Sequence, residues 1–129
     1  MRIALVGGGV IGGGWAGRLV ENGIDAVVYD PHPDAERRVL EVLANAERAW
    51  AKLTQAPRAR GTVTFAPTLE SAVEDAELIQ ESVPEDLALK HLLLADIEEA
   101  APPDALIASS TSGLLPSELQ AELRRPDRF

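Results

Sequence analysis

Three glycines near the start of the chain have the spacing of a phosphate-binding turn. Gly7, Gly9 and Gly12 form the pattern Gly-x-Gly-x-x-Gly between a short apolar run and a stretch with helical apolar spacing. The first glycine of such a turn permits a tight bend, the second lets a diphosphate approach the backbone, and the third lets helix and strand pack closely. The diphosphate then lies at the helix N-terminus, whose free N–H groups favour an anion. We therefore predict a dinucleotide-binding turn, made of Gly7, Gly9, Val10, Ile11 and Gly12.

An acidic residue follows at the position where a dinucleotide's ribose is expected. Asp30 closes a second apolar run 18 positions after Gly12, close to the offset of about 20 residues at which an acid accepts hydrogen bonds from the adenosine ribose. A carboxylate there repels a 2′-phosphate, so the sequence favours NAD over NADP. Arg37 and Arg38 lie in the next helical stretch and leave a phosphate-binding alternative open. Domains that bind FAD or S-adenosylmethionine share parts of the same pattern.

Two later motifs carry further polar side chains. The first runs from Gln80 to Leu87 and leads to Lys90, and the second runs from Ala108 to Gly113. Each follows a predicted strand. Segments that leave the carboxyl ends of the strands in a doubly wound sheet meet in one crevice. We therefore expect both motifs to face the cofactor held by the glycine turn.

The elements that must position these residues alternate between strand and helix. The apolar strands are continuous and β-branched, which is typical of a parallel sheet covered by helices on both faces. Strands are predicted near 2–6, 26–29, 62–65, 78–79 and 105–108, and helices over 10–21, from 34 onwards, and over 69–75, 87–100 and 116–124. The fold class is therefore α/β, a doubly wound parallel sheet of the Rossmann type, in a single domain over residues 1–129.

Composition excludes several other classes of function. The 129 residues suit one domain, and 12 basic against 21 acidic residues give a net charge of −9, which disfavours nucleic acid and anionic membranes as partners. The chain has no cysteine, and its two histidines, His32 and His91, lie too far apart to suggest a metal site, so none is expected. The longest apolar run is shorter than a membrane span and lacks the pattern of a signal peptide. A cytoplasmic location is the expectation.

Through these motifs the sequence resembles the NAD-binding domain of the 3-hydroxyacyl-CoA dehydrogenase superfamily over essentially its whole length. The resemblance rests on residues 7–16, 80–85, 89–91 and 110–113. Within the superfamily these segments look most like the members that oxidise L-carnitine, and next like those that oxidise L-gulonate. The acyl-CoA enzymes usually have Asn-Thr-Ser where this chain has Ser110-Thr111-Ser112, and the helix after Asp30 lacks their Ser and Lys pattern for the thioester carrier. Both departures disfavour an acyl-CoA substrate.

The resemblance implies a role for each matching residue. Gly7, Gly9, Gly12 and Asp30 would bind the adenine half of NAD. Glu85 and Lys90 would lie beside the nicotinamide ribose, and Ser112 would act in catalysis by contacting both the cofactor and the substrate's 3-oxygen. Simpler interpretations are a surface ion pair between Glu85 and Lys90, and a helix-capping role for Ser112.

The resemblance also implies a reaction. Hydride would pass from C3 of a small 3-hydroxy acid to nicotinamide, and the family's catalytic histidine would lie after residue 129, in a helical domain that also forms a homodimer. On that expectation the 129 residues alone are inactive. The alternative from another class is a non-catalytic dinucleotide-binding module, which would need no proton acceptor.

Overall fold

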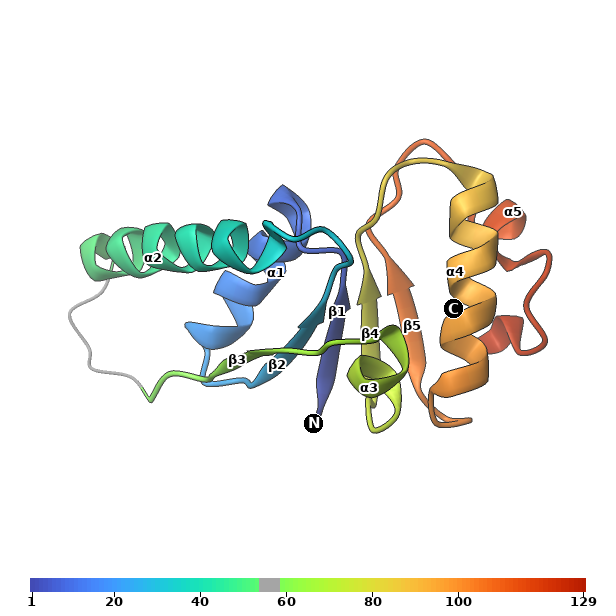
Figure 1. Cartoon of the computed structure of the whole chain (residues 1–129), viewed down its shortest axis with the longest axis horizontal. Coiled ribbons are helices and arrows are strands. Elements are labelled where there is room, and N and C mark those ends of the chain that lie inside the picture. The colour runs from blue at the N-terminus through green and yellow to red at the C-terminus, as the bar shows by residue number, and fades with distance from the viewer. Residues whose placement is uncertain (54–58) are drawn as a thin grey trace.

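Along the described part of the chain, five short strands alternate with helices. The computed structural model describes residues 1–53 and 59–129 (Figure 1). The strands are β1 (Ile3–Val6), β2 (Ala26–Tyr29), β3 (Val63–Phe65), β4 (Leu78–Glu81) and β5 (Leu106–Ser109). The helices are α1 (Val10–Val20), α2 (Ala35–Leu53), α3 (Leu69–Val73), α4 (Leu87–Ala100) and α5 (Pro116–Gln120), followed by the short 3₁₀ helix η1 (Pro126–Arg128). The predicted α/β alternation is confirmed.

All strand pairs are parallel, in the order β3-β2-β1-β4-β5. The chain moves outward from β1 to β3 and then returns to the other side of β1 to form β4 and β5. The connections from β1 and from β4 therefore leave in opposite directions at the centre of the sheet. In open α/β sheets this switch point forms a crevice outside the carboxyl ends of the strands. The same edge carries the glycine turn and both later motifs.

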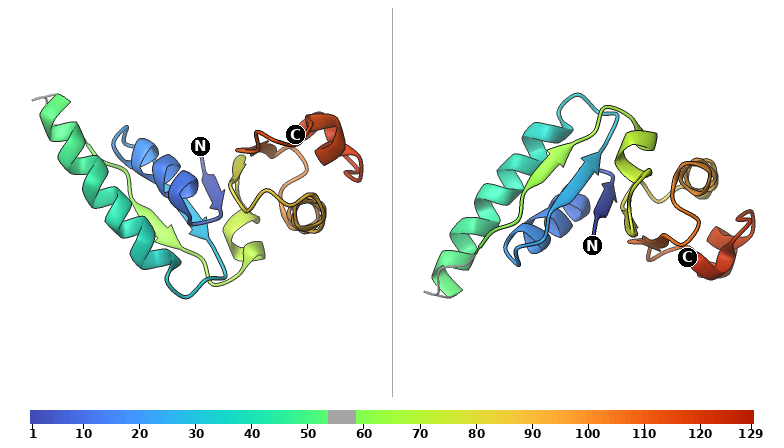
Figure 2. Two further views of the ribbon diagram at one scale, coloured as in Figure 1. Left: turned by 90° about the horizontal axis from the view of Figure 1, so that it is seen from above. Right: turned by 90° about the horizontal axis from the view of Figure 1, so that it is seen from below.

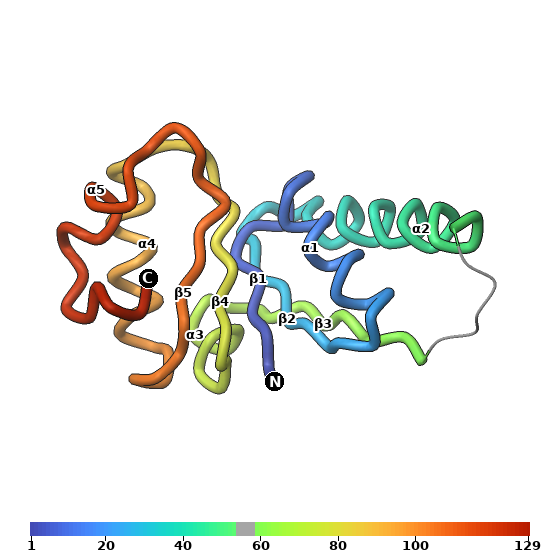
Figure 3. Tube along the Cα trace, turned by 180° about the vertical axis from the view of Figure 1, so that it is seen from behind, coloured from blue at the N-terminus to red at the C-terminus, as the bar shows by residue number. Residues whose placement is uncertain are grey.

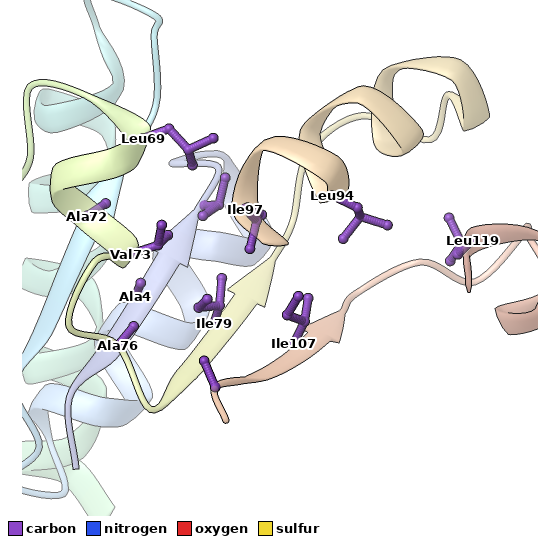
Figure 4. Packing of buried hydrophobic residues seen from close by; sticks show 12 residues of the cluster. Ala4, Leu69, Ala72, Val73, Ala76, Ile79, Leu94, Ile97, Ile107 and Leu119 are labelled. Atoms are coloured by element: carbon purple, nitrogen blue, oxygen red, sulfur yellow. The ribbon is translucent and has the colours of Figure 1, made fainter. Parts of the chain in front are cut away.

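Each face of the sheet is covered by its own set of helices. Along β1, Ile3 and Leu5 pack in one cluster with Ala16 of α1 and Val39 of α2. Ala4 and Val6 point to the other face, into the cluster of α3, α4 and α5 that Figure 4 shows. Figure 2 shows α1 and α2 at one end of the molecule and α4 and α5 at the other. Buried apolar area on both faces holds the strand ends in fixed positions.

The last helix is shorter than its apolar spacing predicted. Instead of reaching residue 124, α5 ends at Gln120. The N–H groups of Arg124 and Arg125 donate to the carboxylate of the buried Glu98, at 2.8 and 2.6 Å. The Glu98 carboxylate thus accepts the N–H groups that a longer helix would have bonded to its own carbonyl oxygens. Within residues 1–53 and 59–129, none of the helices has the length and apolar character that a membrane crossing requires.

Candidate functional site

A cavity of about 1320 Å³ lies at the carboxyl ends of the strands. The loops after β1, β2, β4 and β5 contribute to it, and Figure 3 shows that the segments after β4 and β5 run side by side. Seven of the site residues expected from the sequence line this cavity; they are Gly7, Gly9, Val10, Ile11, Asp30, Glu85 and Ser112. The topology therefore brings together residues that are far apart in the chain.

The glycine turn has the shape that its sequence pattern requires. Gly7 has a φ of 104°, and a Cβ at this position would lie 2.7 Å from the carbonyl oxygen of Ser82. At Gly12 a Cβ would lie 1.8 Å from the carbonyl oxygen of Gly7, so only glycine lets α1 begin this close to β1. A Cβ at Gly9 would meet nothing within 4 Å. Gly7 and Gly12 thus form the bend, and Gly9 leaves open space above it.

The N-terminus of α1 is not capped by a side chain. Its N-cap is Gly9, which makes no side-chain hydrogen bond, and the first turn contains no acidic residue. Val10 and Ile11 are 86% and 55% exposed. The backbone N–H groups of this first turn are the orphan donors of an eleven-residue helix, and they open onto the cavity. This end of α1 fits a diphosphate, because N–H donors and the helix dipole both favour an anion.

Asp30 lies on the β2 side of the cavity in a fixed orientation. Its Oδ2 accepts a hydrogen bond of 2.6 Å from the Gly8 N–H, and its Oδ1 accepts one of 2.8 Å from the His32 N–H. An ionised carboxylate has about four acceptor positions, so Asp30 keeps acceptor capacity for ribose hydroxyls. Arg37 is bonded to Glu41 at 2.7 Å and lies outside the cavity lining, whereas Arg38 belongs to it.

Glu85 joins the segments after β4 and β5. Its Oε2 accepts the Thr111 hydroxyl at 2.6 Å, and its Oε1 accepts the N–H groups of Ser112 and Gly113 at 2.9 and 2.6 Å. The Thr111 hydroxyl, followed by the amides of Gly113 and Ser112, lowers the pKa of Glu85 to about 2. Glu85 is therefore ionised at neutral pH and holds the loop that carries Ser112.

Lys90 is placed differently from the expectation. The residue is fully buried, and Nζ lies 2.7 Å from Glu81 Oε1 and 3.2 Å from the carbonyl oxygen of Val83. The prediction of a surface ion pair between Lys90 and Glu85 is wrong, because Lys90 pairs with Glu81 inside the protein. Contact between Lys90 and the nicotinamide ribose stays a prediction, because the two bonds to Glu81 and Val83 leave the ammonium one further donor.

Glu81 is a site residue that the sequence reading missed. Besides Lys90, it accepts the Val83 N–H at 2.6 Å and the Ser109 hydroxyl at 2.5 Å, so it ties the ends of β4 and β5 together. The sequence signal for this role was a glutamate at the end of an apolar strand, because a buried carboxylate needs hydrogen-bonding or charged partners.

Ser112 lies on the exposed part of the loop and lines the cavity. The N-cap of α5 is Leu115, so the helix-capping interpretation of Ser112 is wrong. Within the described residues, no group of three or more His, Cys, Asp or Glu side chains is arranged to hold a metal ion.

Comparison with known proteins identifies close relatives. The chain is 58% identical over 129 residues to an L-carnitine dehydrogenase/betainyl-CoA thioesterase of Rhizobium sp, a match that covers 99% of this chain and 26% of the relative. It is 47% identical to an L-carnitine dehydrogenase of Mesorhizobium japonicum, over 99% of this chain and 36% of the relative. The chain thus spans well under half of either protein.

Solved structures agree in fold. A 5-formyl-3-hydroxy-2-methylpyridine 4-carboxylic acid 5-dehydrogenase, described as an NAD⁺-dependent dismutase, superposes with a TM-score of 0.88 at 36% identity, covering 98% of this chain and 42% of that one. A 3-hydroxybutyryl-CoA dehydrogenase of Escherichia coli, at 21% identity and a TM-score of 0.85, shares the fold. The family model described as 3-hydroxyacyl-CoA dehydrogenase, NAD binding domain, matches residues 2–129. The chain therefore belongs to the family of NAD-binding domains of 3-hydroxyacyl-CoA dehydrogenases.

Proposed function

We propose that this chain is the cofactor-binding part of an NAD-dependent dehydrogenase that oxidises the 3-hydroxyl of L-carnitine. One observation carries the cofactor assignment: the uncapped N-terminus of α1 opens onto a cavity that has Asp30 on one side and the loops after β4 and β5 on the other. Across this cavity a dinucleotide places its diphosphate at α1 and its two nucleosides on opposite sides.

Each part of the cavity has a defined task in this proposal. The N–H groups of the first turn of α1 bind the diphosphate, and Asp30 accepts hydrogen bonds from the adenosine ribose. Glu85 keeps the loop of residues 111–113 in place, so Ser112 stands beside the nicotinamide side of the cavity. Bound NAD supplies the hydride acceptor, and the protein contributes binding and orientation. Ser112 contacts the reacting oxygen in this proposal, and a general base from outside these 129 residues takes the hydroxyl proton.

L-Carnitine is the proposed substrate because relatives that are 58% and 47% identical to this chain bear the name L-carnitine dehydrogenase. The sequence offers a supporting departure from the acyl-CoA enzymes, with Ser110 in place of their asparagine. L-Gulonate and 3-hydroxyacyl-CoA are the competing substrates. The proposal includes a homodimeric protein in the cytoplasm.

The test is a substrate panel on the full-length protein, monitored at the nicotinamide absorbance. NAD reduction with L-carnitine but not with D-carnitine supports the proposal, and L-gulonate and 3-hydroxybutyryl-CoA serve as competitors in the same assay. Faster turnover of either competitor would reassign the substrate. NADH binding without turnover of any panel member would favour a non-catalytic dinucleotide-binding module.

A further inference from the structure

Two serine hydroxyls meet in the lining of the cavity and have been given no role so far in holding the cofactor. Ser82 directly follows β4, and Ser110 directly follows β5. Their Oγ atoms lie 2.8 Å apart, and both residues line the cavity. A hydroxyl pair at this place is a candidate binding group, because its polar atoms border the space where the cofactor is expected.

The buried side chain of Gln80 fixes the direction of the hydrogen bonds at this pair. Its Nε2 lies 3.2 Å from the carbonyl oxygen of Glu81, which can only accept, so the atom at that position must be the amide nitrogen. The same nitrogen lies 2.9 Å from Ser110 Oγ. Ser110 therefore accepts a hydrogen bond from Gln80, and its own hydroxyl hydrogen stays available.

The pair must then offer one O–H donor to the cavity. Two hydroxyls carry two hydrogens, and a single hydrogen forms the bond between Ser82 and Ser110. Across residues 1–53 and 59–129, the only other side-chain partner of the pair is Gln80, which is a donor. Whichever serine donates to the other, one hydrogen is left for an acceptor on a bound molecule.

The position of the pair favours the cofactor over the substrate. Ser82 contacts the glycine turn: a Cβ at Gly7 would lie 2.7 Å from the Ser82 carbonyl oxygen, and a Cβ at Gly12 would lie 3.9 Å from the Ser82 Cβ. Asp30 lies across the turn, on the β2 side. Ser82 and Ser110 are also less exposed than Ser112, which lies further along its loop. The strand order therefore places the hydroxyl pair and Asp30 on opposite sides of the turn, as the two nucleosides of a dinucleotide require.

We propose that Ser82 and Ser110 together form the hydrogen-bonding anchor for the nicotinamide nucleoside of the cofactor. This inference rests on the proposed NAD site and adds the residues that hold the nicotinamide half of the cofactor. The side-chain amide of Gln80 holds Ser110 in place by donating a hydrogen bond to its Oγ.

The experiment measures binding by calorimetry in the full-length protein, with NADH and ADP as separate ligands. The double variant Ser82→Ala/Ser110→Ala, which removes both hydroxyls, should weaken NADH binding by about two- to twelvefold, the range for one neutral hydrogen bond, and leave ADP binding unchanged. Each single variant should lose less than the double variant, because the remaining serine keeps a hydroxyl hydrogen that it can donate to the cofactor. Ser117→Ala, on an exposed position of α5, is the matched control and should leave both ligands unaffected.

Unchanged ADP affinity also shows that each variant has kept its fold. Unchanged NADH affinity in the double variant overturns the inference and leaves the proposed function standing. Equal weakening of NADH and ADP overturns it as well, because the serines would then act on the turn rather than on the nicotinamide nucleoside. If the wild-type protein binds ADP but not NADH, the proposed function falls together with the inference.

Discussion

Replacement of Asp30 by alanine tests the adenosine side of the cavity. The Asp30 carboxylate lines the cavity and accepts hydrogen bonds from the Gly8 and His32 N–H groups, which leaves it acceptor capacity for a ligand. Hydrogen bonds to a charged group are worth about 1.5–3 kcal/mol, so Asp30→Ala should raise the Kd for NADH by about 10- to 150-fold. The same loss should appear with AMP, because the contact involves only the adenosine ribose.

Isothermal titration calorimetry with NADH and AMP measures this change. Glu41→Ala is the matched control, since Glu41 is an exposed acid outside the cavity lining whose partner is the surface side chain of Arg37. Thermal unfolding separates a loss of binding from a loss of fold, because Asp30→Ala also leaves the part-buried Gly8 N–H without its acceptor. An unchanged Kd for both ligands in a folded Asp30→Ala variant would refute the ribose assignment.

Three further predictions follow from other parts of the site. Ser112→Ala in the full-length protein should lower kcat more than it lowers NAD affinity, and steady-state kinetics with unchanged kcat would remove Ser112 from catalysis. The pKa of Glu85 is lowered from 4.5 to about 2 in the folded protein, so its hydrogen bonds stabilise the fold fully above pH 4.5 and lose this effect as the pH falls toward 2. The difference in unfolding free energy between the wild-type protein and Glu85→Gln, measured in urea melts, should therefore shrink as the pH falls from 4.5 toward 2. A difference that does not change with pH would contradict this. Lys90→Met should destabilise the protein by about 3–5 kcal/mol because it leaves the Glu81 carboxylate buried and unpaired. The double variant Glu81→Leu/Lys90→Met should recover part of that loss in the same melts, and no recovery would argue against the ion pair as its cause.

The glycine turn and the order of elements could be predicted because their signals are local. Gly7 and Gly12 stand where a side chain would collide with the backbone, so the sequence pattern directly reflects the geometry. The strands are short apolar runs, and their parallel arrangement follows from the helices between them. Sequence reasoning therefore placed Gly9 and Asp30 at the same cavity correctly.

The buried polar contacts could not be predicted in the same way. Lys90 lies nine positions from Glu81, and Ser109 lies 28 positions from it, so their meeting depends on how β4 and β5 pair. The capping interpretation of Ser112 failed for a related reason: the loop is held by Glu85 from another segment, and α5 begins only at Pro116. Motif spacing shows which polar residues follow each strand. Which of them pair with one another depends on how the strands and helices pack in three dimensions.

The crystal structure of the full-length protein with NADH tests the central claim most directly. The account predicts the diphosphate at the N-terminus of α1 above Gly9, the adenosine ribose hydroxyls within hydrogen-bond distance of Asp30, and the nicotinamide between the loops after β4 and β5. A diphosphate bound elsewhere, or a glycine turn left without ligand at saturating NADH, would contradict it.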